Sequence, residues 1–121
     1  MSVEDVARDL VALIAAGRDD EAGRKYWSAD LRSIEAAPDM PVAEGPDAAA
    51  AKGEWFMDNH EVHDVKVEGP WLNGCQFAAR FTYDLTPKAT GRRTTFDEIA
   101  LYTVKEGKIV EERFFYEAGG S

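Results

Sequence analysis

The chain has 121 residues, of which 45% are hydrophobic and 31% charged, and its formal net charge is -9. That length suits a single domain over residues 1–121, and the composition is typical of a globular protein with a substantial core. The acidic charge disfavours nucleic acid and anionic membranes as partners, and no stretch approaches the roughly 20 apolar residues of a membrane helix. The N-terminus lacks the basic flank of a signal peptide, so we expect a cytoplasmic protein.

The first half of the chain is predicted to be mainly helical. Apolar residues recur at three- and four-residue spacing over residues 3–16, which predicts a helix ended by Gly17. A second helix is predicted over 19–27 and a third over about 47–58. Between them we expect a short strand over 31–36 and a proline-rich loop over 37–46.

From His60 onward the apolar spacing changes to two, which is typical of strands with one buried face. Strands are predicted over residues 63–68, 77–84, 96–104 and 109–116, with a break at 69–74 and a hairpin loop at 85–93. Helices followed by a meander of strands predict an α+β fold. We expect a cone-shaped, curved antiparallel sheet with the N-terminal helices packed on its concave face, enclosing a ligand pocket.

Three stretches of the sequence are similar to a known family: YWSADLRSIEA, EGPDAA and GKIVEERFFYE. With the order of the elements, they resemble the SnoaL-like branch of the nuclear transport factor 2-like superfamily, over about residues 4–117. The resemblance implies a cystatin-like α+β barrel, a flexible tail at 118–121 and a homodimer through the sheet. That fold hosts isomerases, polyketide cyclases, hydrolases, dehydratases and non-catalytic binding domains, so it leaves open whether the chain is an enzyme.

Ketosteroid isomerases of the same superfamily offer a template for the pocket. Their catalytic base falls at Glu35, although a one-residue slip would remove this match. Their two oxyanion donors fall near Leu10 and Ala100, neither of which can donate a side-chain hydrogen bond. Because an enolate needs donors directed at its oxygen, the loss of both argues against steroid isomerase chemistry.

Strand alternation gives two further candidate catalytic residues. Glu98 lies on the face of Phe96 and Tyr102, and Glu112 lies on the face of Phe114 and Tyr116. With Glu35 they would form a group of inward carboxylates that raise one another's pKa and supply an acid and a base near neutral pH. The alternatives are a rim salt bridge from Glu98 to an arginine, an exposed strand end at Glu112, and a solvent position for Glu35.

The two histidines are also candidates. His63 shares the strand parity of Val65 and Val67, which places it in the pocket as a catalytic group, and His60 would lie at the mouth. Packed, hydrogen-bonded histidines are the alternative. No metal site is expected, because a His-x-x-His spacing in a strand directs the two rings to opposite faces.

Aromatic side chains on the inward faces are expected to line the pocket, or else to belong to the core. The candidate ligand-binding residues, besides His60, are Trp55, Phe77, Phe81, Tyr102, Phe114 and Tyr116. The leading hypothesis is a small-molecule pocket protein that acts without a cofactor as an isomerase, cyclase or lyase, by carboxylate acid-base chemistry on a small apolar oxygenated ligand. The alternatives are a non-catalytic ligand-binding domain and a dimeric interaction module with a closed pocket.

Overall fold

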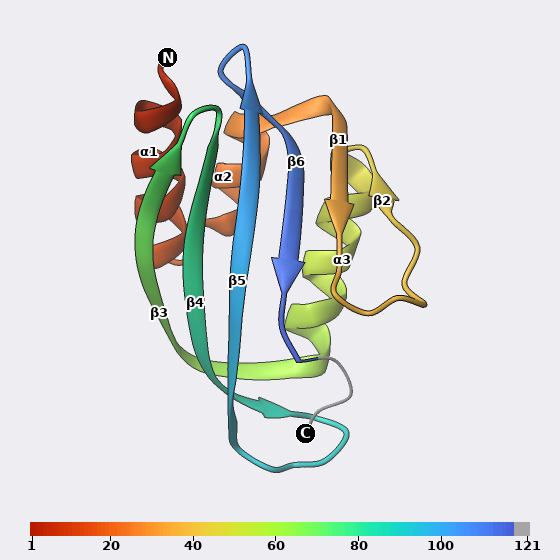
Figure 1. Cartoon of the computed structure of the whole chain (residues 1–121). Helices are drawn as coiled ribbons and strands as arrows, with labels where there is room; N and C mark the ends of the chain where they lie inside the picture. Colours follow the sequence, from red (N-terminus) through yellow and green to blue (C-terminus); the bar gives the residue numbers. More distant parts are fainter. Residues whose placement is uncertain (118–121) are drawn as a thin grey trace.

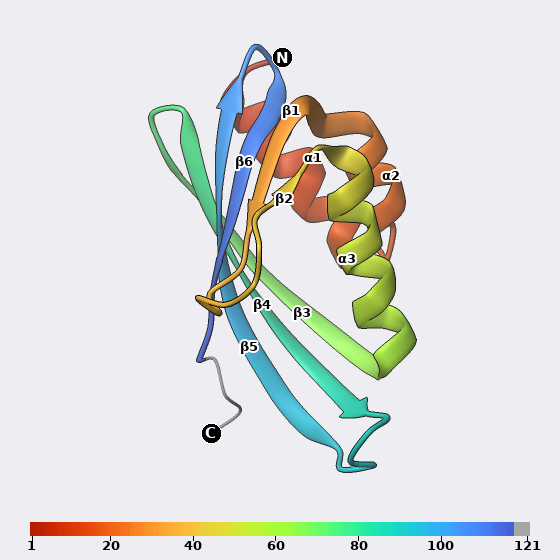
Figure 2. The same cartoon turned by 90° about the vertical axis from the view of Figure 1, so that its right-hand side faces the viewer.

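The computed structural model describes residues 1–117 and places helices on one side of a six-stranded, curved, open sheet (Figures 1 and 2). The flexible tail expected at 118–121 lies outside the described residues. The sheet order is β2-β1-β6-β5-β4-β3, and all neighbours are antiparallel except β1 and β6. The predicted α+β class is confirmed. The elements are α1 (Val3–Ala15), α2 (Asp19–Tyr26), β1 (Trp27–Ile34), β2 (Ala43–Glu44), α3 (Pro46–Asn59), β3 (His60–Asn73), β4 (Gln76–Pro87), β5 (Thr94–Lys105) and β6 (Lys108–Phe115).

The strands are longer than the sequence pattern predicted. β3 continues through Gly69 and Pro70, where a break was expected, and absorbs them as an irregularity in its pairing with β4. Proline is tolerated there because β3 is an edge strand, so a missing N–H costs no ladder hydrogen bond on its outer side. β1 begins at Trp27 rather than residue 31, and β2 lies within the expected loop.

The core lies between the helices and the concave face of the sheet, as Figure 2 shows. On β4 and β5 every second side chain is buried there, as the alternation predicts. α1 covers this face with its predicted apolar stripe, and each large buried side chain contributes about 1.5–3 kcal/mol by leaving water. None of the helices among residues 1–117 has the length and apolar character needed to cross a membrane.

Two of the register shifts in the sheet are β-bulges that change the phase of the alternation near candidate site residues. On β3, Val62 lies opposite Leu85 and Asp64 lies opposite Asp84, so His63 is an extra residue without a partner on β4. A second shift, between β5 and β6, makes Val110 the extra residue. A bulge turns the side chains on its two sides to different faces than simple parity predicts. His63 is therefore exposed, although Val65 and Val67 face inward, and the expectation that they share a face is wrong.

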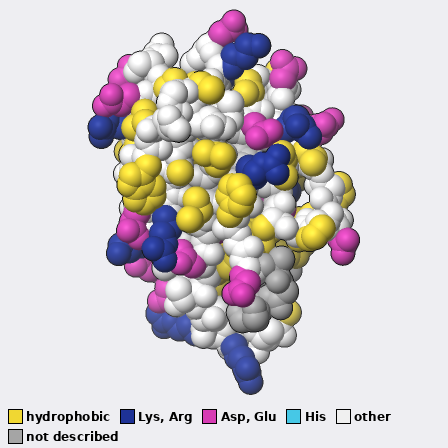
Figure 3. All heavy atoms as spheres, in the orientation of Figure 1, with side chains coloured by type: hydrophobic (Ala, Val, Ile, Leu, Met, Phe, Trp, Pro, Cys, Tyr) yellow, Lys and Arg dark blue, Asp and Glu magenta, His cyan; other side chains and the backbone are white. Residues whose placement is uncertain are grey.

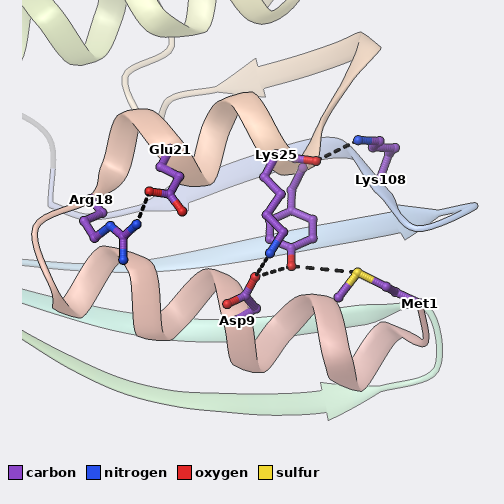
Figure 4. Close-up of polar contacts among 7 residues, drawn as sticks. Met1, Asp9, Arg18, Glu21, Lys25 and Lys108 are labelled. Atoms are coloured by element: carbon purple, nitrogen blue, oxygen red, sulfur yellow. Dashed lines mark hydrogen bonds and ion pairs between the residues drawn. The ribbon is translucent and has the colours of Figure 1, made fainter.

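α1 and α2 are joined by polar contacts at their outer edge (Figure 4). Asp9 accepts hydrogen bonds from Lys25 Nζ, at 2.6 Å, and from the hydroxyl of Tyr26, whose ring is buried. Lys108 Nζ donates to the Lys25 carbonyl oxygen at 2.7 Å, which links the β5–β6 hairpin to α2. The hydrogen bond from Lys25, followed by that from Tyr26, lowers the pKa of Asp9.

We expect the substitution Asp9→Asn to destabilise the fold at neutral pH and to have little effect in acid. A carboxylate whose pKa is lowered by folding stabilises the native state above its unfolded-state pKa, and that contribution is lost as the pH falls through the lowered value. Urea denaturation of wild type and variant at several pH values measures the difference. Asp39→Asn, at an exposed loop position, is the charge-matched control. A difference that is independent of pH would contradict the prediction.

Candidate functional site

Four charged side chains meet between α3 and the sheet, and we call Glu35, Lys52, Glu98 and Glu112 the interior charge cluster. Glu112 is buried at 6% exposure, and the side chains of Glu35 and Lys52 are 16% and 21% exposed. Burial, followed by the charges of Glu35 and Glu112, raises the pKa of Glu98, and the charge of Lys52 lowers it, so the four groups influence one another electrostatically. The structure thus brings together the three glutamates that the sequence singled out and adds a lysine that it did not.

Glu112 is fixed by two hydrogen bonds. Its carboxylate accepts from Ser33 Oγ at 2.7 Å and from Trp27 Nε1 at 2.9 Å. Parallel pairing of β1 with β6 places Ser33 directly opposite Glu112, so the strand register itself brings hydroxyl and carboxylate together. Burial raises the pKa of Glu112, and the two hydrogen bonds oppose that rise by stabilising the charged form. Both oxygens are occupied, which indicates a structural role.

Glu35 also has both oxygens occupied. Lys52 Nζ lies 2.5 Å from Oε2, and the hydroxyl of Tyr116 donates to Oε1 at 2.8 Å. Glu35 follows the end of β1, Lys52 comes from α3 and Tyr116 follows β6, so three parts of the chain converge on one carboxylate. Burial, and then the hydrogen bond to Glu35, raise the pKa of Tyr116, which therefore keeps its proton as a donor.

Lys52 reaches the interior because of its position on α3. Ala49, Lys52 and Phe56 are three and four residues apart, so they share the helix face that packs on the sheet. The ammonium group also lies 5.3 Å from the ring centre of Phe114 on β6. Trp55 is one residue off this face and is 61% exposed. The prediction that Trp55 lines the pocket as a ligand-binding residue is therefore wrong.

Glu98 differs from the other two glutamates. It is mostly buried on β5, and among residues 1–117 no hydrogen-bond or ion-pair partner is found for its carboxyl group. Burial, followed by the charges of Glu35 and Glu112, raises its pKa to about 8. The charge of Glu98 in turn contributes, after burial, to raising the pKa of Tyr83. Glu98 is thus largely a neutral carboxylic acid at pH 7 whose proton is not engaged.

Aromatic rings surround the cluster toward the C-terminal end of α3. Phe56 packs on Tyr83 with ring centres 5.5 Å apart, and Phe96 lies 6.1 Å from Tyr83 and 5.3 Å from Tyr116. His60 stacks on Phe56 at 4.4 Å, and its Nδ1 donates to the Phe56 carbonyl oxygen at 2.8 Å. His60 thus lies at the edge of this aromatic group, close to where the sequence placed it.

The remaining candidates are His63, which is exposed, and five aromatic residues, of which three lie in the core and two contact the charge cluster. His63 is exposed and contacts Thr86 Oγ1 at 2.8 Å through its Nε2, so the structure does not bring it to the glutamates. Phe77 and Tyr102 stack at 4.8 Å in the core, where Phe81 is also buried. These three candidate ligand-binding residues therefore pack against other core side chains, whereas Phe114 and Tyr116 contact Lys52 and Glu35.

Sequence reasoning missed Lys52, Ser33 and Trp27. The spacing of Lys52 between Ala49 and Phe56 was the available signal, but lysine is rarely buried, which favours a solvent position. Ser33 follows the buried Leu31 by two residues, so strand parity places it inside. Among residues 1–117, no group of three or more His, Cys, Asp or Glu side chains has the arrangement of a metal site.

Two surface hollows also occur. One, of about 170 Å³, is lined by Arg80, Asp97, Glu98, Ile99 and Phe115. The other, of about 350 Å³, lies beside β1 and is lined by residues 29–32 with Glu44 and Gly45. Most of the lining of the first hollow belongs to the face of the sheet that the helices leave open.

Comparisons with known proteins agree on the fold. Residues 1–116 match the model of the SnoaL-like domain family. A crystal structure from Mesorhizobium loti, proposed to be a SnoaL-like polyketide cyclase, is 50% identical and has a TM-score of 0.91, over 96% of this chain and 100% of that one. Comparison with curated protein sequences found no match.

Two more distant structures are similar in fold alone. A proposed isomerase from Bacillus subtilis is 17% identical with a TM-score of 0.77, over 97% of this chain and 90% of that chain. A cystatin-like protein of unknown function from Xanthomonas campestris has the same identity and TM-score, over 96% and 91%.

We expect Ser33→Ala to destabilise the protein by about 1–3 kcal/mol at pH 8 and by less at pH 5, because a buried carboxylate loses one of its donors. Folding raises the pKa of Glu112, so its burial costs stability as the pH rises, and losing Ser33 enlarges that cost. Urea denaturation at both pH values measures the effect. Ser28→Ala, on the same strand but away from Glu112, is the control; an equal loss at both pH values would contradict the proposed role of Glu112.

Proposed function

The chain belongs to the SnoaL-like domain family, and from its interior charge cluster we propose that it is a cofactor-independent enzyme of the isomerase, cyclase or lyase type. The ligand is a small, largely apolar molecule that carries a carbonyl group. The family supports a small-molecule pocket protein in general, and the 50% identical structure from Mesorhizobium loti is itself proposed to be a polyketide cyclase.

One observation carries the proposal: among three inward glutamates, Glu98 alone has an unengaged carboxyl group within the described residues, and its pKa is about 8. Glu112 and Glu35 are each held by two donors. A catalytic acid or base works best when its pKa lies near the working pH, because both protonation states are then available. Strongly shifted ionisable groups on an apolar face are also concentrated at functional sites.

Isomerisation, aldol-type cyclisation and elimination can all begin with the same step. The ionised form of Glu98 takes a proton from a carbon next to a carbonyl group, and the electron pair moves to the carbonyl oxygen as an enolate. The neutral Glu98 then returns the proton to another carbon, to an oxygen or to a leaving group, which regenerates the carboxylate. Glu98 replaces Glu35 as the base in this scheme, because Glu35 is already bound by Lys52 and Tyr116.

The proposal is tested by hydrogen–deuterium exchange at carbon. The probes are 2,4-pentanedione, 1-indanone and 2-tetralone in D₂O, followed by proton NMR with wild type, Glu98→Gln and the exposed-site control Glu54→Gln. We expect wild type and Glu54→Gln to accelerate exchange and Glu98→Gln to lose the acceleration by about 10²-fold or more. The rate should rise with pH through the Glu98 pKa of about 8, as the group ionises beside Glu35, Glu112, Lys52 and Asp97.

The same samples separate catalysis from binding alone. A carboxyl ¹³C titration of labelled protein gives the Glu98 pKa directly, and a value near 4.5 would contradict the proposal. If probes shift the spectra of the protein without any faster exchange, the chain is a non-catalytic ligand-binding domain. If no probe binds, the mutual packing of Phe56, Tyr83 and Phe96 favours an interaction module with a closed pocket.

We propose in addition that the protein forms a homodimer through the sheet. The face away from the helices carries large exposed apolar side chains: Ile99 at 46% on β5, Phe115 at 49% directly opposite it on β6, and Trp71 at 55% on the edge strand β3. Figure 3 shows hydrophobic side chains gathered on this face. Contiguous exposed apolar surface of this kind usually marks an interface.

We therefore expect Ile99→Glu to lower the molar mass measured by light scattering from that of a dimer to that of a monomer, because a buried unpaired charge opposes association. Met57→Glu is the matched control, since Met57 is 58% exposed on α3, on the other side of the sheet. Dimers that persist in Ile99→Glu would exclude this face as the interface, and a monomeric wild type would exclude the dimer.

A further inference from the structure

Two hydrogen-bond donors converge on Glu35 from different elements. The Lys52 ammonium lies 2.5 Å from one carboxylate oxygen, and the Tyr116 hydroxyl lies 2.8 Å from the other. The side chains of Lys52 and Glu35 are 21% and 16% exposed, so the group is accessible from solvent without being a surface pair. Because both donors bind oxygens of the Glu35 carboxylate, they can bind an oxygen atom that carries negative charge.

We propose that Lys52 and Tyr116 are the donor pair that binds a negatively charged oxygen of the ligand, and that Glu35 occupies these donors when no ligand is bound. The ligand class is a molecule whose oxygen is, or becomes, anionic: an enolate or a phenolate. This inference rests on the proposed function for its site and for the enolate step. It names the groups that stabilise the charge which removal of a proton by Glu98 creates.

Electrostatics favours this assignment. Lys52 contributes positive charge among three carboxyl groups, and Glu98 is largely neutral at pH 7, so an incoming anion meets less repulsion than the number of glutamates implies. The raised pKa of Tyr116 keeps its hydroxyl protonated and able to donate. Donors held in place by the protein stabilise developing charge more effectively than water does, because they need no reorganisation.

The placement of the donors is also rigid. Lys52 extends from the inner face of α3, and its ammonium lies over the ring of Phe114. The ring of Tyr116 contacts Phe96 on β5 at 5.3 Å, beside Glu98. Donors and proton-transfer group therefore come from neighbouring positions of β5, β6 and α3.

The test uses 4-nitrophenol, whose phenolate absorbs visible light and whose neutral form does not. Wild-type protein is titrated with the probe from about pH 5.5 to 9, alongside Lys52→Met, Lys52→Arg, Tyr116→Phe and Glu35→Gln. We expect wild type to bind the phenolate and to lower the pKa of the bound probe, and Lys52→Met to bind it about tenfold more weakly. Lys52→Arg should retain most of the binding. Tyr116→Phe should show a smaller loss than Lys52→Met.

Glu35→Gln provides the sharpest readout. Because Glu35 competes with the probe for Lys52, we expect this variant to bind phenolate more tightly than wild type, by about threefold or more. A purely structural salt bridge would predict the opposite, since breaking it would disorder the site. The double variant Glu35→Gln/Lys52→Met keeps the net charge of the wild type and guards against misfolding of the single variants; it should bind as weakly as Lys52→Met.

The outcomes are distinguishable from those of the proposed function. Wild type that gives no phenolate signal, or Lys52→Met that binds as tightly as wild type, overturns the inference even if Glu98→Gln abolishes proton exchange. Weaker phenolate binding in Glu35→Gln, with an unchanged melting temperature, overturns it as well. Phenolate binding that depends on Lys52 supports the inference even if Glu98→Gln retains exchange, in which case the proposed function alone is wrong.

Discussion

Three carboxyl groups lie in an apolar interior, and the structure depends on how each one is accommodated there. A buried carboxylate without a partner costs several kcal/mol, so it must be paired, hydrogen-bonded or protonated. Glu35 is paired with Lys52, Glu112 accepts hydrogen bonds from Ser33 and Trp27, and Glu98 keeps its proton. The three solutions differ: Glu35 and Glu112 are each held by two hydrogen-bond donors, whereas the carboxyl group of Glu98 has no such partner among the described residues.

The topology of the sheet makes these solutions possible. Parallel pairing of β1 with β6 places Ser33 opposite Glu112, and the two strands then lead to Glu35 and Tyr116, which bond to each other. The bulge at Val110 sets the phase of β6, so that Glu112 and the residues two and four positions later face the helices. α3 covers this region and contributes Lys52. If β1 paired elsewhere in the sheet, Glu112 would lose Ser33 as a hydrogen-bond donor.

The alternation of apolar residues along the sequence was sufficient to predict the inward orientation of part of the site. Glu98 and Glu112 follow from strand parity with Phe96 and Ala100 and with Phe114 and Tyr116, respectively, because no bulge lies between each glutamate and these residues. The exposed position of His63 does not follow from parity, because a bulge at His63 displaces it. A bulge depends on how many residues of the partner strand lie opposite, and the sequence of β3 alone does not give that pairing. Lys52 was missed, and Trp55 was wrongly placed in the pocket, for a related reason: an Ala-rich helix does not show which of its faces packs on the sheet.

Protonation of Glu98 and binding of an anion at Lys52 are coupled, and the coupling favours the proposed reaction. An anion beside Lys52 adds negative charge near Glu98 and so raises its pKa further, while a protonated Glu98 removes repulsion and strengthens binding of the anion. Protonation of Glu98 and binding of an enolate beside Lys52 therefore stabilise each other. Before proton transfer, the ionised Glu98 is destabilised by Glu35 and Glu112 and gains most by taking up a proton. In the proposed reaction, the excess of acidic groups in the interior favours proton removal from carbon, and Lys52 and Tyr116 stabilise the negative charge that this removal leaves on the ligand oxygen.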